Sequence, residues 1–230
     1  MPSATTTTTW PAASDVVDLH AHCAAQGIDL DDALARLRKV YDLVDEANAR
    51  NTGGLDLPCH SGCSACCEDA VFMSELEFMA LWHFCQTHVD DDERARMVHR
   101  SQRLVHDHAA VFAAMADRLA RGEHDLTDLA MPLRLRCPIL NDDGACQAYS
   151  WRELWGRLFG QSFNDEGGIY GCHLVGDHLI GRQVTLLPAR ATARRLLGLP
   201  LTRGSQLLPA WVVQWYGPGA PDLVTLTTTA

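Results

Sequence analysis

The chain has 230 residues, of which 47% are hydrophobic and 21% are charged. This balance is typical of a globular protein and excludes disorder over most of the length. The formal net charge of −10 at pH 7 disfavours nucleic acid and anionic lipid as general partners of the surface. The longest uncharged apolar stretch, near residues 207–219, is interrupted by Pro209 and Pro218, so no membrane span is predicted.

The two ends of the sequence differ from its middle. Residues 1–14 form a Thr-, Ala- and Pro-rich tract for which we expect a disordered tail, and we expect a frayed tail over 225–230. Between them the composition predicts one domain, residues 15–224. The first residues lack the charged and apolar regions of a signal peptide, so we expect a cytoplasmic protein with reduced thiols.

Helical patterns occupy much of the first 200 residues. Apolar residues recur at helical spacing over 27–51, and Asn51–Gly54 has the composition of a helix end. Ser74 and Glu77 have the spacing of a capping box, which predicts a helix reaching about His88. We expect a single long helix over 90–122 and shorter helices over 151–161 and 189–199.

Strand-like patterns are fewer. Residues 137–149 are typical of a short hairpin with a turn at Asn141–Gly144. Segments 178–187 and 207–216 contain many β-prone residues, which predicts a small β-rich C-terminal part. The expected fold is α+β and mainly α-helical, with a cysteine-rich loop and the short hairpin forming a metal site.

Cysteine is the most informative residue type. The nine cysteines are Cys23, Cys59, Cys63, Cys66, Cys67, Cys85, Cys137, Cys146 and Cys172. In a reducing compartment, clustered cysteines indicate metal ligands rather than disulfides. We interpret Cys85 as a core residue within a helix, and the His20–Cys23 stretch as surface sequence.

The first cysteine cluster has the spacing of a metal site. Cys63 and Cys66 are separated by two residues, so one tight turn places both sulfurs about 2.3 Å from a single ion. Cys59 precedes Cys63 by four residues, or one helical turn. Cys66 and Cys67 are neighbours, so either one binds metal while the other packs, or each faces a different ion.

A second group of cysteines completes the predicted ligand set. The hairpin brings Cys137 and Cys146 together at its base, and Cys172 follows further along. The predicted ligands are Cys59, Cys63, Cys66, Cys67, Cys137, Cys146 and Cys172, with His60 and His173 as alternative ligands. Seven cysteines exceed one tetrahedral site, which leaves a two-metal site, an iron–sulfur cluster and spare redox thiols open.

The spaced motif resembles a known family. Cys59-x-x-x-Cys63-x-x-Cys66-Cys67, followed by Cys137-Pro-x-Leu and by Gly144-x-Cys146-x-x-Tyr149, is similar to the YkgJ-like CxxCxxCC family of zinc- or iron-chelating domains. The similarity covers about residues 57–172. It departs from the family in its longer first gap and in having Gly156 where the family pattern has cysteine. The resemblance implies metal chelation, and Cys172 is a candidate replacement for the absent thiol.

Three hypotheses about function remain open at this stage. The first is a zinc- or iron-chelating protein with a structural or metal-handling role. The second is an enzyme or enzyme component with an iron–sulfur or redox-thiol centre, because flagellin lysine methylases carry a similar cysteine motif. The third is a zinc-organised interaction module that uses the Arg-rich segment 182–203 to contact a protein partner.

Overall fold

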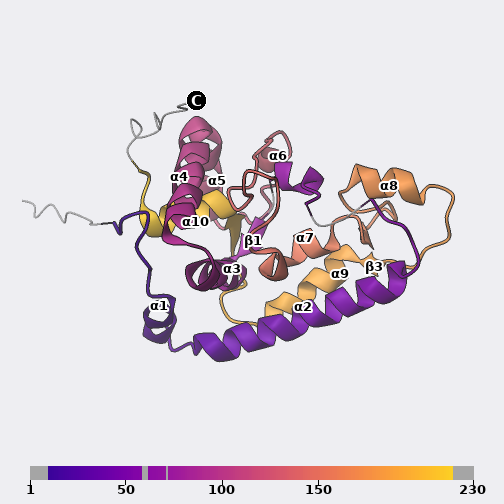
Figure 1. The fold of residues 1–230 in the computed structure, drawn as a ribbon, viewed down its shortest axis with the longest axis horizontal. Coiled ribbons are helices and arrows are strands. Elements are labelled where there is room, and N and C mark those ends of the chain that lie inside the picture. Colours follow the sequence, from indigo (N-terminus) through magenta and orange to yellow (C-terminus); the bar gives the residue numbers. More distant parts are fainter. Residues whose placement is uncertain (1–9, 59–61, 71, 220–230) are drawn as a thin grey trace, which may run out of the picture.

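The computed structural model describes residues 10–58, 62–70 and 72–219. The chain is mainly helical (Figure 1). Its helices are α1 (Leu19–Ala25), α2 (Leu30–Thr52), α3 (Glu75–His88), α4 (Asp91–Asp107), α5 (Ala109–Ala120), α6 (Thr127–Ala130), α7 (Leu154–Leu158), α8 (His173–Leu179), α9 (Ala189–Ala193) and α10 (Leu208–Tyr216). Three 3-10 helices are η1 (Ala65–Glu68), η2 (Tyr149–Trp151) and η3 (Arg194–Gly198). None of the described helices is long and apolar enough to span a bilayer.

Two very small sheets link distant parts of the chain. Strand β1 (Phe72–Ser74) pairs antiparallel with β4 (Ser205–Leu207), with Phe72 opposite Leu207. Strand β2 (Ser162–Phe163) pairs parallel with β3 (Leu187–Pro188). The expected α+β, mainly helical fold is therefore confirmed at this level.

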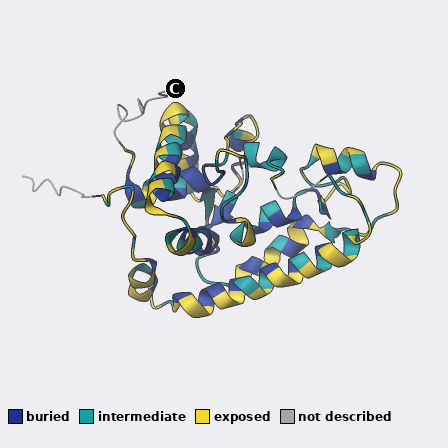
Figure 2. Cartoon of the chain, viewed as in Figure 1, coloured by how far each residue is buried: buried dark blue, intermediate teal, exposed yellow. Residues whose placement is uncertain are grey.

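Helix α3 lies at the centre of the main core. Ser74 and Glu77 form the predicted capping box, and the helix ends at His88 as expected. Phe78 stacks between Trp82 and Trp211 of α10, with ring centroids 5.8 and 5.9 Å apart. Figure 2 shows buried residues concentrated on α3 and on the inner faces of the helices around it. Helices α2 and α10 contact α3, and α4 packs against α10. Side chains repeating at helical spacing line one apolar side of each of these helices.

The segment 90–122 is two helices rather than the predicted single one. The break lies at His108, between α4 and α5. Met97 and Val98 of α4 belong to the main core, whereas Phe112 and Met115 of α5 belong to a second, smaller apolar cluster. The helix is interrupted because its two halves bury their side chains in different places.

The prediction of a β-rich C-terminal part is wrong. Residues 208–216 form α10, and only the short strands β3 and β4 are extended there. Leu208, Trp211, Val212 and Tyr216 are buried at helical spacing, and Pro209 is tolerated in the first helical turn. The β-prone composition is thus outweighed by helical periodicity. Segment 178–187 begins in α8, and the predicted helix over 151–161 is only α7.

The N-terminal segment is packed where the structure describes it. Residues 1–9 and 220–230 lie outside the described part. Of the predicted tails, only residues 10–14 can therefore be compared with the structure. There, Ala13 contacts the main core, and the Ser14 carbonyl accepts a 2.7 Å hydrogen bond from the Arg94 guanidinium. Residues 13 and 14 are therefore held against the core, and the disordered tail stays a prediction for the rest of the tract.

Candidate metal site in a cysteine pocket

The two cysteine segments are joined by their backbones. The Cys137 N–H donates to the Cys67 carbonyl at 2.7 Å, and the Leu135 N–H donates to the Glu68 carbonyl at 2.9 Å. An antiparallel bridge between Asp69 and Arg134, whose side chains also form an ion pair, extends this contact. Residues 70 positions apart in the sequence are thereby held side by side.

Five of the seven predicted ligands line one pocket of about 110 Å³. These five are Cys63, Cys66, Cys67, Cys137 and Cys146. Tyr149, Arg152 and Glu153 line the same pocket, together with apolar side chains from β1, α3 and α10. The structure therefore brings the two predicted clusters to a single place. The described cysteines form no disulfide with one another.

A short 3-10 helix positions the first segment. Gly62 precedes it with φ of +88°, a conformation that favours glycine, and the Cys67 N–H donates to the Ser64 carbonyl at 2.9 Å. Cys66 and Cys67 both line the pocket, so neither is set aside in the core. A hydrogen bond with Cys67, together with burial, raises the pKa of the Cys66 thiol well above its ordinary value.

The second segment turns where the sequence predicts, but its hairpin is shorter than expected. Its ladder is one antiparallel bridge between Leu140 and Cys146, and Asn141 accepts the Ala145 N–H on its side chain at 2.8 Å. Gly144 closes the turn with φ of +78°. The predicted hairpin is therefore a tight loop with its two cysteines near the base.

Backbone amides face both thiols of this second segment. The backbone amide of Ile139 lowers the pKa of Cys137 and that of Ala148 lowers the pKa of Cys146, so each amide favours the thiolate. Burial outweighs them and raises the pKa of Cys137 to about 12, and it raises the pKa of Cys146 in the same direction. Such thiols stay protonated until a cation compensates their charge.

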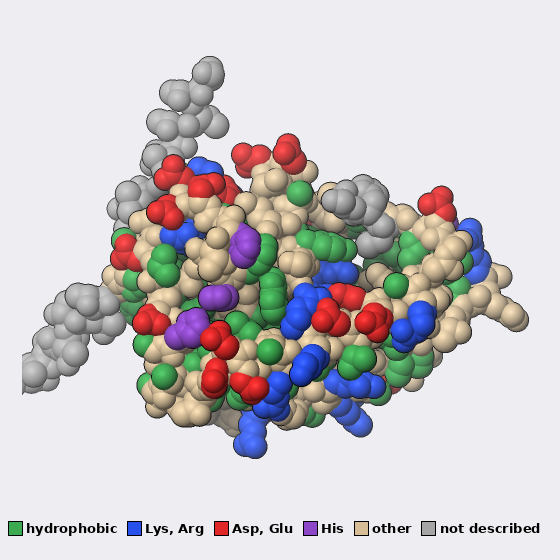
Figure 3. All heavy atoms as spheres, turned by 60° about the horizontal axis from the view of Figure 1, so that its bottom comes forward, with side chains coloured by type: hydrophobic (Ala, Val, Ile, Leu, Met, Phe, Trp, Pro, Cys, Tyr) green, Lys and Arg blue, Asp and Glu red, His purple; other side chains and the backbone are tan. Residues whose placement is uncertain are grey.

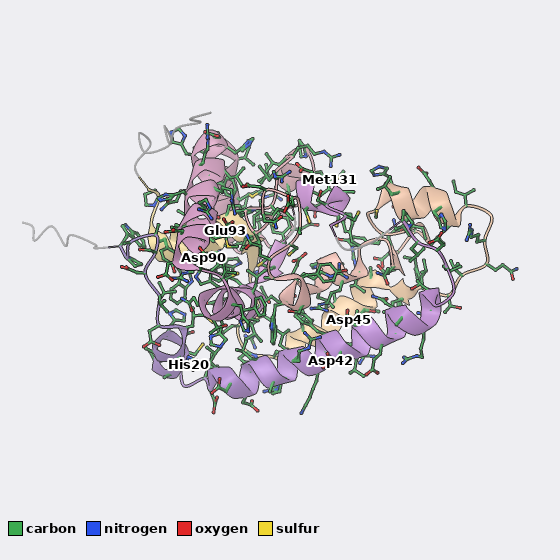
Figure 4. All side chains as sticks on the ribbon, in the orientation of Figure 1. His20, Asp42, Asp45, Asp90, Glu93 and Met131 are labelled. Atoms are coloured by element: carbon green, nitrogen blue, oxygen red, sulfur yellow. The ribbon has the colours of Figure 1, made fainter. Side chains whose placement is uncertain are left out.

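Helix α4 supports this segment from outside. Arg100 donates to the Pro138 carbonyl at 2.7 Å and to Glu93 at 2.7 Å, and Gln147 donates to the same carboxylate at 2.8 Å. Glu93 stands near the start of α4, one turn from the N-cap residue Asp90 (Figure 4). Burial opposes its ionisation, but the hydrogen bonds from Arg100, Arg96 and Gln147 lower the pKa of Glu93.

Two buried side chains hold residues 150–157 against α2 and α3. Glu77 accepts hydrogen bonds from the Tyr41 hydroxyl at 3.2 Å and from the Leu154 N–H at 2.8 Å. The Arg157 guanidinium bonds Asp45 and the Arg152 carbonyl, and it lies 4.0 Å from the centre of the Tyr41 ring. The pocket wall at 152–156 is therefore fixed by the long helix α2.

Glu153 is a pocket residue that the sequence analysis missed. A Cβ built at Gly156 would lie 2.4 Å from Glu153 Oε1, so the carboxylate occupies the space of a side chain at 156. Burial raises the pKa of Glu153, and the nearby Glu77 carboxylate adds to the shift. In the sequence, the only indication of this arrangement was Gly156, because a glycine leaves room for the side chain of another residue.

The remaining predicted ligands lie elsewhere or outside the description. Cys59 and the alternative ligand His60 fall in 59–61, which the structure does not describe. Cys172 is the N-cap residue of α8, packs beside Gly160 and is not part of the pocket lining. The predicted convergence of Cys172 with the other cysteines is therefore not seen at the pocket, and His173 is exposed.

The two cysteines outside the clusters are both buried. Cys85 lies in the main core, as expected, and burial raises its pKa to about 12. Cys23 is also fully buried and its sulfur lies 3.5 Å from that of Met79, so our interpretation of it as surface sequence is wrong. His20 is exposed beside it and lies 5.6 Å from the ring of His83. On the face of the molecule that Figure 3 shows, histidine side chains lie close to carboxylate side chains.

The donor atoms in the pocket fit a soft or borderline metal ion. Thiolate sulfur suits zinc and iron, and carboxylate oxygen is accepted by both. Within 10–58, 62–70 and 72–219, however, no three His, Cys, Asp or Glu side chains are already arranged to hold an ion. Binding therefore requires the thiols to lose protons and to rotate toward a common point.

Comparison with known proteins adds no relationship. Neither a protein-family model, nor a curated protein, nor a solved structure matches the chain. The resemblance to the YkgJ-like family thus rests on the cysteine motif alone.

Proposed function

We propose that this protein chelates zinc or iron through the cysteines of the pocket, in a structural or metal-handling role. The observation that carries the proposal is the convergence of Cys63, Cys66 and Cys67 with Cys137 and Cys146 on one pocket. Two segments far apart in the sequence supply these thiols, so a bound ion adds to the stability of the fold. The amides facing Cys137 and Cys146 favour the charged form that a metal needs.

The test is the metal content of protein purified without oxygen. We expect stoichiometric zinc or iron in the wild type and a large loss in Cys66→Ser and Cys137→Ser. The matched control is Cys85→Ala, which removes a buried thiol that does not line the pocket. Equal metal content in all four proteins would overturn the ligand assignment. A loss of metal in Cys85→Ala equal to that in Cys66→Ser and Cys137→Ser would show that we have wrongly divided the cysteines into metal ligands and core residues.

Because the pocket has more thiols than one tetrahedral ion needs, an iron–sulfur or redox-thiol centre is the second candidate function. Five cysteines line the pocket, one more than a single tetrahedral ion uses. An enzyme or enzyme component of the methyltransferase-associated type would use such a centre. Absorption separates the candidates, because an iron–sulfur protein is brown with visible bands and a zinc site is colourless.

The Arg-rich segment 182–203 receives less support as a docking surface. Arg190 is paired with Asp165 at 3.0 Å, and Arg36 of α2 reaches the Gly198 carbonyl at 2.9 Å. Basic and acidic side chains are interspersed on the face that contains α2 (Figure 3). This mixed charge argues against a uniformly basic interface there.

A further inference from the structure

Glu153 has an environment that is unusual for a carboxylate. It stands at the N-cap position of α7, on the wall of the cysteine pocket. Cys66, Cys137 and Cys146 line the same pocket. Glu153 therefore shares one pocket with cysteines of both segments, and its Oε1 occupies the space that a side chain at 156 would take.

No cation in the described part of the chain forms an ion pair with Glu153. Arg152, its neighbour in the sequence, lies over the ring of Tyr149 at 4.3 Å. The buried Nε of Arg152 has no hydrogen-bond partner among the described residues. Asp69 is the other acidic residue of the pocket, and it is already paired with Arg134. Glu153 is thus the pocket carboxylate that no cation of the described residues pairs with.

A divalent cation satisfies this arrangement. A carboxylate without a cationic partner is costly where it is partly removed from water, and thiolates in the same pocket increase that cost by repulsion. A metal ion placed between them reverses the sign of both interactions. Carboxylate oxygen binds zinc at about 2.0–2.2 Å and thiolate sulfur at about 2.3 Å, so the two ligand types share one coordination sphere readily.

We propose that Glu153 supplies a carboxylate ligand to the metal bound by the pocket cysteines, so that the site has mixed sulfur and oxygen ligands. This inference rests on the proposed chelating function. A carboxylate at this position adds a harder ligand to a thiolate set, which suits ferrous iron as well as zinc.

The first experiment compares Glu153→Gln with wild-type protein, using zinc alone as the probe. Glutamine keeps the volume and an acceptor for the backbone N–H of Gly156 but removes the charge. We expect the metal-free melting temperature to stay unchanged and zinc affinity to fall at least about tenfold. The zinc K-edge absorption spectrum should lose its oxygen contribution at the short distance. Glu46→Gln, which changes an exposed carboxylate of α2 outside the pocket, is the matched control and should keep wild-type affinity.

The second experiment replaces the oxygen ligand by sulfur. Gly156→Cys combined with Glu153→Ala removes the carboxylate that would collide with a new side chain. We expect this double variant to regain zinc affinity lost in Glu153→Ala and to show one additional sulfur neighbour at the zinc edge.

The outcomes distinguish the two proposals. Zinc binding by the wild type with unchanged affinity and ligand shell in Glu153→Gln would overturn the role of Glu153 and leave chelation intact. A wild type that binds neither zinc nor iron would overturn chelation, and the ligand role with it. A double variant that binds zinc no better than Glu153→Ala would also count against a ligand at this position.

Discussion

The backbone N–H of Cys137 donates a 2.7 Å hydrogen bond to the carbonyl of Cys67, so the two cysteine segments are joined directly by their backbones. We expect the amide hydrogens of Cys137 and Leu135 to exchange slowly with solvent in metal-free protein, because both are bonded to the first segment. Hydrogen exchange measured before and after chelator treatment checks this. Exchange at the rate of an unfolded chain in metal-free protein would show that only the ion joins the segments.

Shortening the N-terminus should reveal where the packed part begins. A variant starting at Val16 loses the Ser14 and Asp15 carbonyls, which accept hydrogen bonds from Arg94 at 2.7 Å and from the Tyr216 hydroxyl at 2.8 Å. Because Arg94 is buried, we expect a loss of about 2–3 kcal/mol in the free energy of unfolding. A variant starting at Trp10 keeps both contacts and is the control. Equal urea midpoints for the two variants would contradict this prediction.

The buried Arg157 should be sensitive even to conservative change. Its guanidinium bonds Asp45 of α2 (Figure 4) and the carbonyls of Ser150 and Arg152. Lysine keeps the charge but cannot make this set of bonds, so we expect Arg157→Lys to cost about 2–3 kcal/mol. The control Arg38→Lys changes a more exposed partner of Asp42 and should cost less than about 1 kcal/mol. Denaturant unfolding measures both, and equal costs would refute the distinction.

Glu93 should make the second cysteine segment sensitive to acid. Its hydrogen bonds with Arg100, Arg96 and Gln147 lower its pKa in the folded protein. A carboxylate with a depressed folded pKa contributes stability above its unfolded pKa, and that contribution is lost as pH falls from about 4.5. The difference in urea midpoint between wild type and Glu93→Gln should therefore shrink between pH 6 and pH 3. A constant difference in urea midpoint across this range would rule out a contribution of ionised Glu93 to stability. Asp92→Asn is the control for general charge effects.

Local signals in the sequence predicted much of the fold. The capping box at Ser74, the helix that ends at His88 and the turn at Asn141–Gly144 follow from short-range chemistry, and all are present. The division of residues 90–122 into α4 and α5 was not predictable, because it depends on two separate apolar clusters that form only in three dimensions. The helix α10 could have been recognised from the spacing of Leu208, Trp211, Val212 and Tyr216.

The candidate site was predicted by residue type rather than by geometry. Cysteine spacing grouped two segments as ligands, and five of the predicted ligands line one pocket. Spacing could not show that Cys172 belongs to the start of α8, since the chain turns back through a bridge between Phe163 and Ile169 while β2 pairs with the distant strand β3. Glu153 has no motif of its own, so its place beside Gly156 is visible only in coordinates.

Cys137 follows Cys67 by 70 positions, and this separation imposes an order on biosynthesis. At 5–20 residues per second, the first cysteines leave the ribosome roughly 4–14 s before the second segment is made. During that interval Cys63, Cys66 and Cys67 lack the thiols of Cys137 and Cys146 that complete the pocket. Nascent chains therefore pass through a stage at which oxidants and unsuitable metals reach an unfinished thiol group. Under the proposed chelating function, loading of the ion belongs after translation, when α3, α4 and α5 have folded and returned the chain to Cys67.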